Sequence, residues 1–162
     1  MSDRTIYAMN FLAVLGTGLV AGVFLAFSSF VMAALARLPT AGGISAMQFI
    51  NITVLNPLFM AVLFGTGVVC LVLGYGAIRG GLAGQNIVLI AGAALYLVGT
   101  IVITMAFNVP LNDALAGLDP DGSEAATLWK DYLQNWTFWN HVRGLAAFLA
   151  CGAFARALSL SV

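Results

Sequence analysis

The sequence is poor in charge. Its 162 residues include six basic and six acidic side chains, so that only 7% of the chain is charged while 62% is hydrophobic. Soluble globular domains carry about 25% charged residues, and this composition excludes such a protein. Nucleic-acid binding is excluded as well, because the chain has no excess of lysine and arginine to place against phosphates.

Side chains that hold metals and cofactors are also scarce. The chain has one histidine, His141, and two cysteines, Cys70 and Cys151, which both lie within apolar runs. One histidine without a nearby cysteine or carboxylate pair does not assemble a usual metal shell. The sequence has no glycine-rich nucleotide loop and no serine nucleophile elbow. We therefore expect no metal and no bound cofactor, haem included, since His141 would be its only good axial ligand.

Long apolar runs are what the sequence has in abundance. Residues 5–36, 38–78 and 80–112 contain no charged side chain, and a fourth apolar stretch near the C-terminus is interrupted by Arg143. A helix that crosses the hydrocarbon core of a bilayer needs about 20 residues. The runs predict an all-α protein, a four-helix transmembrane bundle that forms a single integral membrane domain over the whole chain. The predicted spans are residues 6–35, 55–78, 85–107 and 138–158.

Two connections on one side of the membrane are too long and too patterned to be plain loops. Apolar residues recur at helical spacing in residues 37–55, and a turn around Pro120 precedes a run of aromatic residues within 108–137. These patterns predict interfacial or re-entrant helical segments in the first and third connections. Both termini then lie on the other side. We expect a bacterial inner membrane, and the basic residues, with Arg143 set aside as a site residue, favour both termini on the cytoplasmic side.

Glycines are numerous, and Gly18 and Gly22 have the spacing that lets transmembrane helices approach closely. We expect this spacing to serve packing within the bundle. The same spacing is also compatible with contact between two copies of the chain in a homo-oligomer.

Polar side chains within apolar spans are costly and therefore informative. The amides in question are Gln48, Asn51, Asn56, Asn108, Asn112 and Asn140. All of them fall toward the same side of the membrane as the two long connections. The asparagines near Pro57 and Pro110 have a second explanation, because amides there can cap helices and satisfy carbonyl groups freed by proline.

The richest segment is residues 136–143. On a helix Trp136, Asn140 and Arg143 share one face, and His141 is turned about 100° away from it. Histidine accepts and returns a proton near neutral pH, which makes His141 the candidate acid or base.

The guanidinium of Arg143 suits a carboxylate, phenolate or enolate oxygen. An ion pair with Asp113 or Asp131, or contact with lipid phosphate, would also account for it. The flat side chains of this segment, Trp136, Phe138 and Trp139, are expected either to wall a ligand pocket or to form an interfacial belt.

Several short strings are distinctive together: FSSFVM at 27–32, MQFIN at 47–51, LNP at 55–57, NVPLN at 108–112 and WTFWNHVR at 136–143. With Trp129 and Tyr132 they resemble the anthrone-oxygenase-like family of small four-helix membrane proteins, over essentially the whole chain. The resemblance implies oxidation of an anthrone to an anthraquinone by O₂, without metal or flavin. It supports the same all-α fold.

The resemblance also implies roles for particular residues. His141 would remove a proton from the activated methylene, and Arg143 together with nearby amides would hold the developing oxyanion. The expected catalytic residues are His141, Arg143 and Asn140; the expected substrate-binding residues are Gln48, Asn51, Asn56, Asn108, Asn112, Trp136, Phe138 and Trp139.

The leading hypothesis is a cofactor-independent membrane monooxygenase whose partners are the lipid bilayer, O₂ and an aromatic or quinone-like lipophile. A non-catalytic membrane subunit that binds a quinone or a lipid is the first alternative. A small-solute carrier is the second, and the lack of internal repeats and of charges deep in the spans disfavours it.

Overall fold

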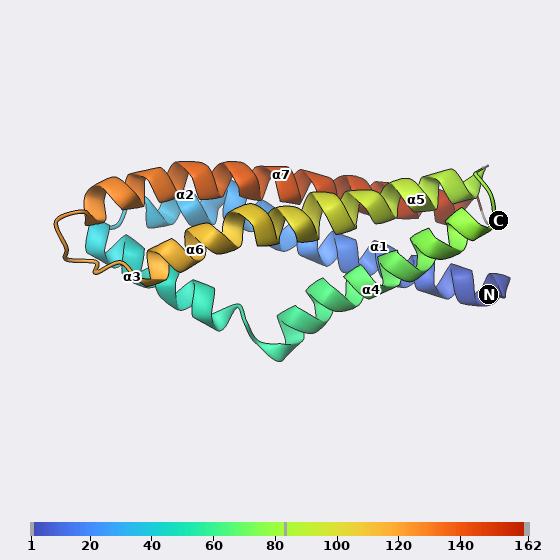
Figure 1. The fold of residues 1–162 in the computed structure, drawn as a ribbon, viewed down its shortest axis with the longest axis horizontal. Helices are drawn as coiled ribbons and strands as arrows, with labels where there is room; N and C mark the ends of the chain where they lie inside the picture. The colour runs from blue at the N-terminus through green and yellow to red at the C-terminus, as the bar shows by residue number, and fades with distance from the viewer. Residues whose placement is uncertain (1, 83, 161–162) are drawn as a thin grey trace.

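The computed structural model describes residues 2–82 and 84–160, and within these ranges the chain forms helices and no strands. The α-helices are α1 Asp3–Ala26, α2 Met32–Leu35, α3 Thr40–Thr53, α4 Pro57–Arg79, α5 Gln85–Tyr96, α6 Val109–Ala116 and α7 Ala125–Ser159. The π-helical segments are η1 Phe27–Val31, η2 Leu97–Val102 and η3 Thr104–Asn108. Figure 1 shows the elements as one elongated bundle with both termini at the same end.

In the described ranges, four continuous helices are long and apolar enough to cross a membrane. They are Asp3–Leu35, Pro57–Arg79, Gln85–Ala116 and Ala125–Ser159. This confirms the predicted all-α fold and its four membrane helices. The longest, Ala125–Ser159, has 35 residues. At about 1.5 Å per residue it exceeds a hydrocarbon core of about 30 Å, so it extends beyond the core.

The helices differ from the predicted spans at the end away from the termini. The third continues past residue 107 to Ala116, and the fourth begins at Ala125 rather than near residue 138. Pro110 does not stop the third helix, because it directly follows the π-helical segment η3, and local adjustments of this kind let a membrane helix continue through a proline. The helix predicted around the aromatic residues and the fourth span are one element, α7.

The ends of α4 are set by local chemistry. Asn56 caps its start, because its Oδ1 accepts a hydrogen bond of 3.0 Å from the backbone N–H of Phe59. After α4 the chain turns back toward α5 within a few residues. Gly81 and Gly84 have φ angles of +95° and +52°, a region that glycine adopts without the strain of a Cβ.

The end of the bundle that holds the termini, called here the terminal half, is an apolar core between α1, α4, α5 and α7. Small residues let these helices approach closely. A Cβ on Gly74 of α4 would lie 2.8 Å from the Cβ of Ala93 on α5. The ring of Phe154 packs in the same way against Gly92.

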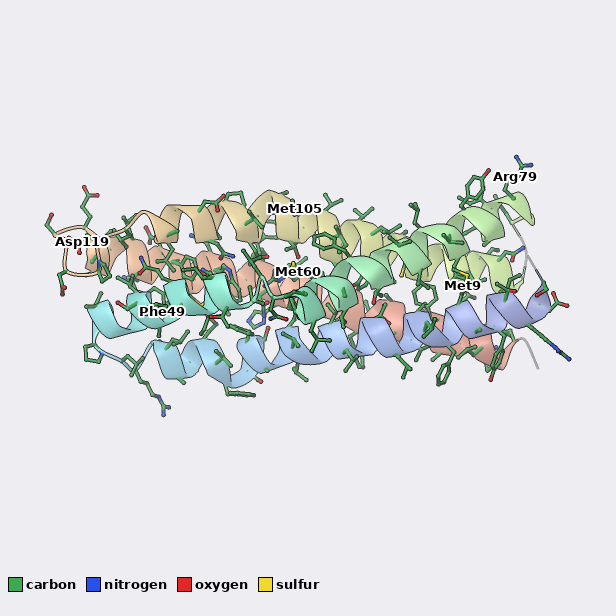
Figure 2. All side chains as sticks on the ribbon, turned by 90° about the horizontal axis from the view of Figure 1, so that it is seen from below. Met9, Phe49, Met60, Arg79, Met105 and Asp119 are labelled. Atoms are coloured by element: carbon green, nitrogen blue, oxygen red, sulfur yellow. The ribbon has the colours of Figure 1, made fainter. Side chains whose placement is uncertain are left out.

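The opposite end, called here the loop half, has a core of larger side chains between α2, α3, α6 and the first turns of α7. Its buried residues include Ile44, Met47, Trp129, Tyr132 and Trp136. Helix α3 occupies the first connection, where the sequence predicts a helical segment. Figure 2 shows Asp119 at this end of the bundle and Arg79 at the other.

Candidate functional site

Arg143 lies near the middle of α7 and is only 7% exposed. Its Nε and Nη2 donate to Asn140 Oδ1 over 3.1 and 2.9 Å, and its Nη1 donates to Thr104 Oγ1 over 3.3 Å. The guanidinium carbon also lies 4.1 Å from the ring centre of Phe24 and 5.0 Å from that of Trp136. A buried cation is thus held by neutral oxygens and two aromatic faces.

Arg143 has no carboxylate partner among the described residues. Its three hydrogen bonds all go to uncharged groups. The ion pairs with Asp113 or Asp131 that the sequence allowed are not formed, and both of these carboxylates are exposed.

Asn140 is fully buried and uses both ends of its amide. Its oxygen accepts from Arg143, and its nitrogen donates over 2.8 Å to the carbonyl of Phe24 and over 2.8 Å to Ser28 Oγ. Because a guanidinium can only donate, Arg143 fixes which end of this amide faces Ser28.

His141 points to the other side of α7 and is exposed. Its Nδ1 lies 2.8 Å from Ser28 Oγ. Ser28 therefore connects His141 to Asn140, and through Asn140 to Arg143. The two residues expected to act together are on different faces of the helix and are joined by this chain of hydrogen bonds, called here the Ser28 relay.

His141 and Ser28 lie along a groove of about 600 Å³ between α1 and α7. The other side chains and backbone atoms that line it are almost all apolar and include Gly18, Gly22, Leu25, Gly144, Leu145 and Phe148. Nothing within 4 Å would meet a Cβ placed on Gly22. The small-residue pair Gly18 and Gly22, expected to serve helix packing, thus also opens this groove.

Arg143 faces a separate interior cavity of about 60 Å³. Asn51, Val54 and Asn112 line this cavity and also line a cleft of about 410 Å³ between α3 and α6. These three shared residues lie between the cavity and the cleft, which are therefore direct neighbours. The cavity and the groove lie on opposite sides of α7.

Asn112 and Asn108 belong to the interior side. Asn112 Oδ1 accepts from Tyr132 Oη over 2.9 Å and from Trp136 Nε1 over 2.8 Å. Asn108 is fully buried and donates over 3.1 Å to the carbonyl of Trp136, and its Oδ1 has no partner in the described part of the chain. Asn51 Nδ2 lies 3.5 Å from Tyr132 Oη.

The remaining predicted site residues lie elsewhere. Gln48 donates to the carbonyls of Leu115 and Leu118 over 2.8 and 2.9 Å, which ties α3 to the end of α6. Asn56 is the exposed cap of α4.

Of the three flat side chains in 136–143, only Trp136 is buried on the interior side. Phe138 is 56% exposed. Trp139 stacks on Phe107 with ring centres 3.7 Å apart. Phe138 and Trp139 therefore line neither the groove nor the cavity.

Sequence reasoning did not select Ser28 or Thr104. Both are small hydroxyl residues inside apolar spans, and that was the available signal. Ser28 lies in η1, while Thr104 and Asn108 lie in η3. The π-helical segments thus border the polar side chains around Arg143 and Asn140, and π-helical segments often lie at functional sites.

A family model described as anthrone oxygenase matches residues 57–153, more than half of the chain. The match runs from α4 into α7 and includes His141, Asn140 and Arg143. No curated protein and no solved structure match the chain. The matched residues establish that this chain belongs to the anthrone oxygenase family.

Proposed function

We propose that this protein is a membrane oxygenase that oxidises an anthrone-like aromatic lipophile with O₂, without a metal or flavin, and that His141 is the base. The observation that carries the proposal is the position of the only histidine: it lies with Ser28 on the wall of a large, otherwise apolar groove on the outside of the bundle.

The groove suits a polycyclic substrate better than the interior cavity does. Small-molecule sites measure about 300–1,000 Å³, and the groove at about 600 Å³ falls in this range whereas the cavity at about 60 Å³ does not. Leu25, Leu145 and Phe148 supply apolar walls. A lipophile dissolved in the bilayer would reach this side of α1 and α7 without crossing water.

The Ser28 relay prepares His141 for proton transfer. In the tautomer with the proton on Nδ1, Ser28 Oγ accepts from both Asn140 and His141, and Nε2 keeps its lone pair as the base. The buried charge of Arg143 is linked to this arrangement only through Asn140, so Arg143 acts as a positioning residue for the groove.

The proposed reaction balances with O₂ as the oxidant. His141 removes a proton from the methylene group that lies between two aromatic rings, which leaves an electron-rich anion. The anion gives an electron to O₂, and combination of the two radicals forms a C–O bond to a peroxide. His141 returns its proton to the peroxide, which then loses water as the second methylene hydrogen leaves. The methylene becomes a carbonyl, and one oxygen atom ends in water.

The test is anaerobic mixing of detergent-purified protein with anthrone, followed by O₂ and detection of anthraquinone by absorbance. General-base catalysis contributes about 10²–10⁴-fold, so His141→Ala should lower the rate over the spontaneous reaction by at least about 100-fold. Gly22→Leu should also lower it, because the new side chain fills the groove. Gly65→Leu is the matched control, since a Cβ there likewise meets nothing within 4 Å.

If the wild-type protein oxidised anthrone no faster than the spontaneous reaction does, the proposed anthrone oxidation would be overturned. An unchanged rate in His141→Ala would overturn the assignment of His141 as the general base.

A non-catalytic quinone-binding subunit is the second candidate, because an imidazole N–H in an apolar groove suits a quinone carbonyl oxygen. This candidate predicts a quinone that co-purifies with the wild-type protein, is lost from Gly22→Leu, and is retained by Gly65→Leu. It also predicts no anthrone turnover.

A further inference from the structure

The interior cavity beside Arg143 contains a buried cation without a counter-charge. Arg143 is 7% exposed, and its hydrogen-bond partners among the described residues are Asn140 and Thr104. An uncompensated charge in a membrane protein is costly, and such residues mark ligand or ion sites. Neutral oxygens and aromatic faces offset only part of that cost.

The guanidinium has donors to spare. Of its five N–H groups, three donate in the recorded hydrogen bonds, two to Asn140 and one to Thr104. One N–H on Nη1 and one on Nη2 therefore have no partner in the described part of the chain. A pair of N–H groups on the two terminal nitrogens matches the two oxygens of a carboxylate.

Asn112 offers a further donor at the same place. Its oxygen is occupied by Tyr132 and Trp136, which fixes the orientation of the amide. Its NH₂ group has no recorded partner within the described residues. Asn112 lines both the cavity and the cleft between α3 and α6.

The dimensions divide the site into two parts. The cavity of about 60 Å³ holds a head group, and the cleft of about 410 Å³ can hold an apolar chain. The cleft is lined mainly by apolar residues, among them Phe49, Ile52, Leu55 and Val109. Its one acidic side chain, Asp113, is exposed and so well placed for screening by solvent.

We propose that this cavity and cleft form a binding site for a carboxylate-headed amphiphile, such as a long-chain acid dissolved in the membrane. The carboxylate of this ligand pairs with Arg143 in the cavity, and its apolar alkyl chain lies in the cleft between α3 and α6. The site is on the other side of α7 from the His141 groove, and it does not depend on the proposed oxidation.

The experiment compares two probes that differ only in the head group, laurate and dodecanol. Binding of each radiolabelled probe to the full-length protein in neutral detergent is measured by equilibrium dialysis, with protein-free micelles as the reference. We expect laurate to bind at least about 10-fold more tightly than dodecanol, since a charge-assisted pair is among the stronger hydrogen bonds.

Two kinds of variant test the site. Arg143→Gln should remove the preference for laurate, and Arg143→Lys should restore only part of it, because an ammonium keeps the charge but lacks the paired donors. Val54→Trp fills the junction of the cavity and the cleft, should abolish laurate binding and leaves Arg143 in place. Val98→Trp is its control, since Val98 is 59% exposed on η2. Size-exclusion chromatography establishes that each variant is folded.

Equal binding of laurate and dodecanol by the wild-type protein would overturn the proposal. So would an unchanged preference in Arg143→Gln, or retained laurate binding in Val54→Trp. His141→Ala should bind laurate as the wild-type protein does, which separates this site from the oxidation at the groove.

Discussion

The two halves of the bundle are held together by different means. In the terminal half the helices meet through small side chains, and Ala147, Ala150 and Ala157 are fully buried there. In the loop half the contacts are aromatic rings and amides that donate across helices, such as Gln48 to α6 and its C-terminal turn and Asn108 to the Trp136 carbonyl of α7.

The difference follows from what each kind of contact requires. Apolar helices in lipid gain most from dispersion, which is strongest when small residues let backbones approach. Where a side chain donates a hydrogen bond from one helix to another, the length of that side chain sets the distance between the helices and leaves space beside it. The interior cavity and the cleft lie toward the loop half, whereas the groove runs from Ser28 along α1 and α7 into the terminal half, where Gly18 and Gly22 leave its space.

The largest expected effect is on the relay in the middle of the bundle. Asn140→Leu removes the oxygen that accepts two bonds from Arg143, and it leaves a buried charge without its main partner. We expect a loss of about 3–5 kcal/mol in the free energy of unfolding. The measurement is unfolding in mixed micelles by titration with a denaturing detergent.

Asn135→Leu is the control for that variant, because Asn135 is an exposed residue of the same helix. Equal stabilities of the two variants would contradict the view that polar contacts hold this region together.

The terminal half should respond instead to added volume. Gly74→Ala places a Cβ 2.8 Å from that of Ala93, and we expect a loss of about 1–3 kcal/mol from overpacking. The second change Ala93→Gly should restore stability in the double variant. Gly76→Ala, two residues along α4, meets nothing within 4 Å and should be tolerated. The prediction is wrong if Gly74→Ala unfolds like Gly76→Ala in the same titration.

A smaller effect is expected where α3 joins α6. Gln48→Leu removes both hydrogen bonds to the carbonyls of Leu115 and Leu118, and a typical hydrogen bond contributes about 1 kcal/mol. We expect a loss of about 1–2 kcal/mol and faster amide hydrogen exchange in α3, read by mass spectrometry. Gln134→Leu, at an exposed position of α7, is the comparison and should leave exchange in α3 as it is.

The smallest effect concerns the cap of α4. Asn56→Ala removes the acceptor of the Phe59 N–H and should cost about 1 kcal/mol, whereas Asn56→Ser keeps an acceptor and should cost less. Thermal unfolding followed by circular dichroism distinguishes the two variants. Identical melting curves of the two variants would contradict the view that the side-chain acceptor of Asn56 stabilises the start of α4.

Much of the fold is readable from the sequence because its signal is local. Hydropathy over about 20 residues marks each membrane helix, and the helical period places Trp136, Asn140 and Arg143 on one face, where all three are buried. The continuation of the third helix through Pro110 was missed, because a proline is disruptive or harmless according to its position in a helix.

The arrangement around α7 was not readable in the same way. The sequence shows that His141 turns away from Arg143, but not that Ser28 of η1 joins them or that a groove and a cavity lie on opposite sides of the helix. These features depend on which helices pack against each face of α7, and the residues involved are far apart in the chain. The hydrogen bond between Ser28 and Asn140 spans 112 positions.

The π-helical turns make the site sensitive to chain length as well as to side chains. In η1 the N–H of Met32 bonds to the carbonyl of Phe27, five residues back, so the turn accommodates one residue more than an α-turn. Deleting a single residue there would convert the turn to an α-turn and leave the helix on both sides in nearly the same relative orientation, because the turn already holds the extra residue. A one-residue deletion in η1 is therefore a route by which evolution can change which side chain occupies the position of Ser28 without turning the rest of the helix.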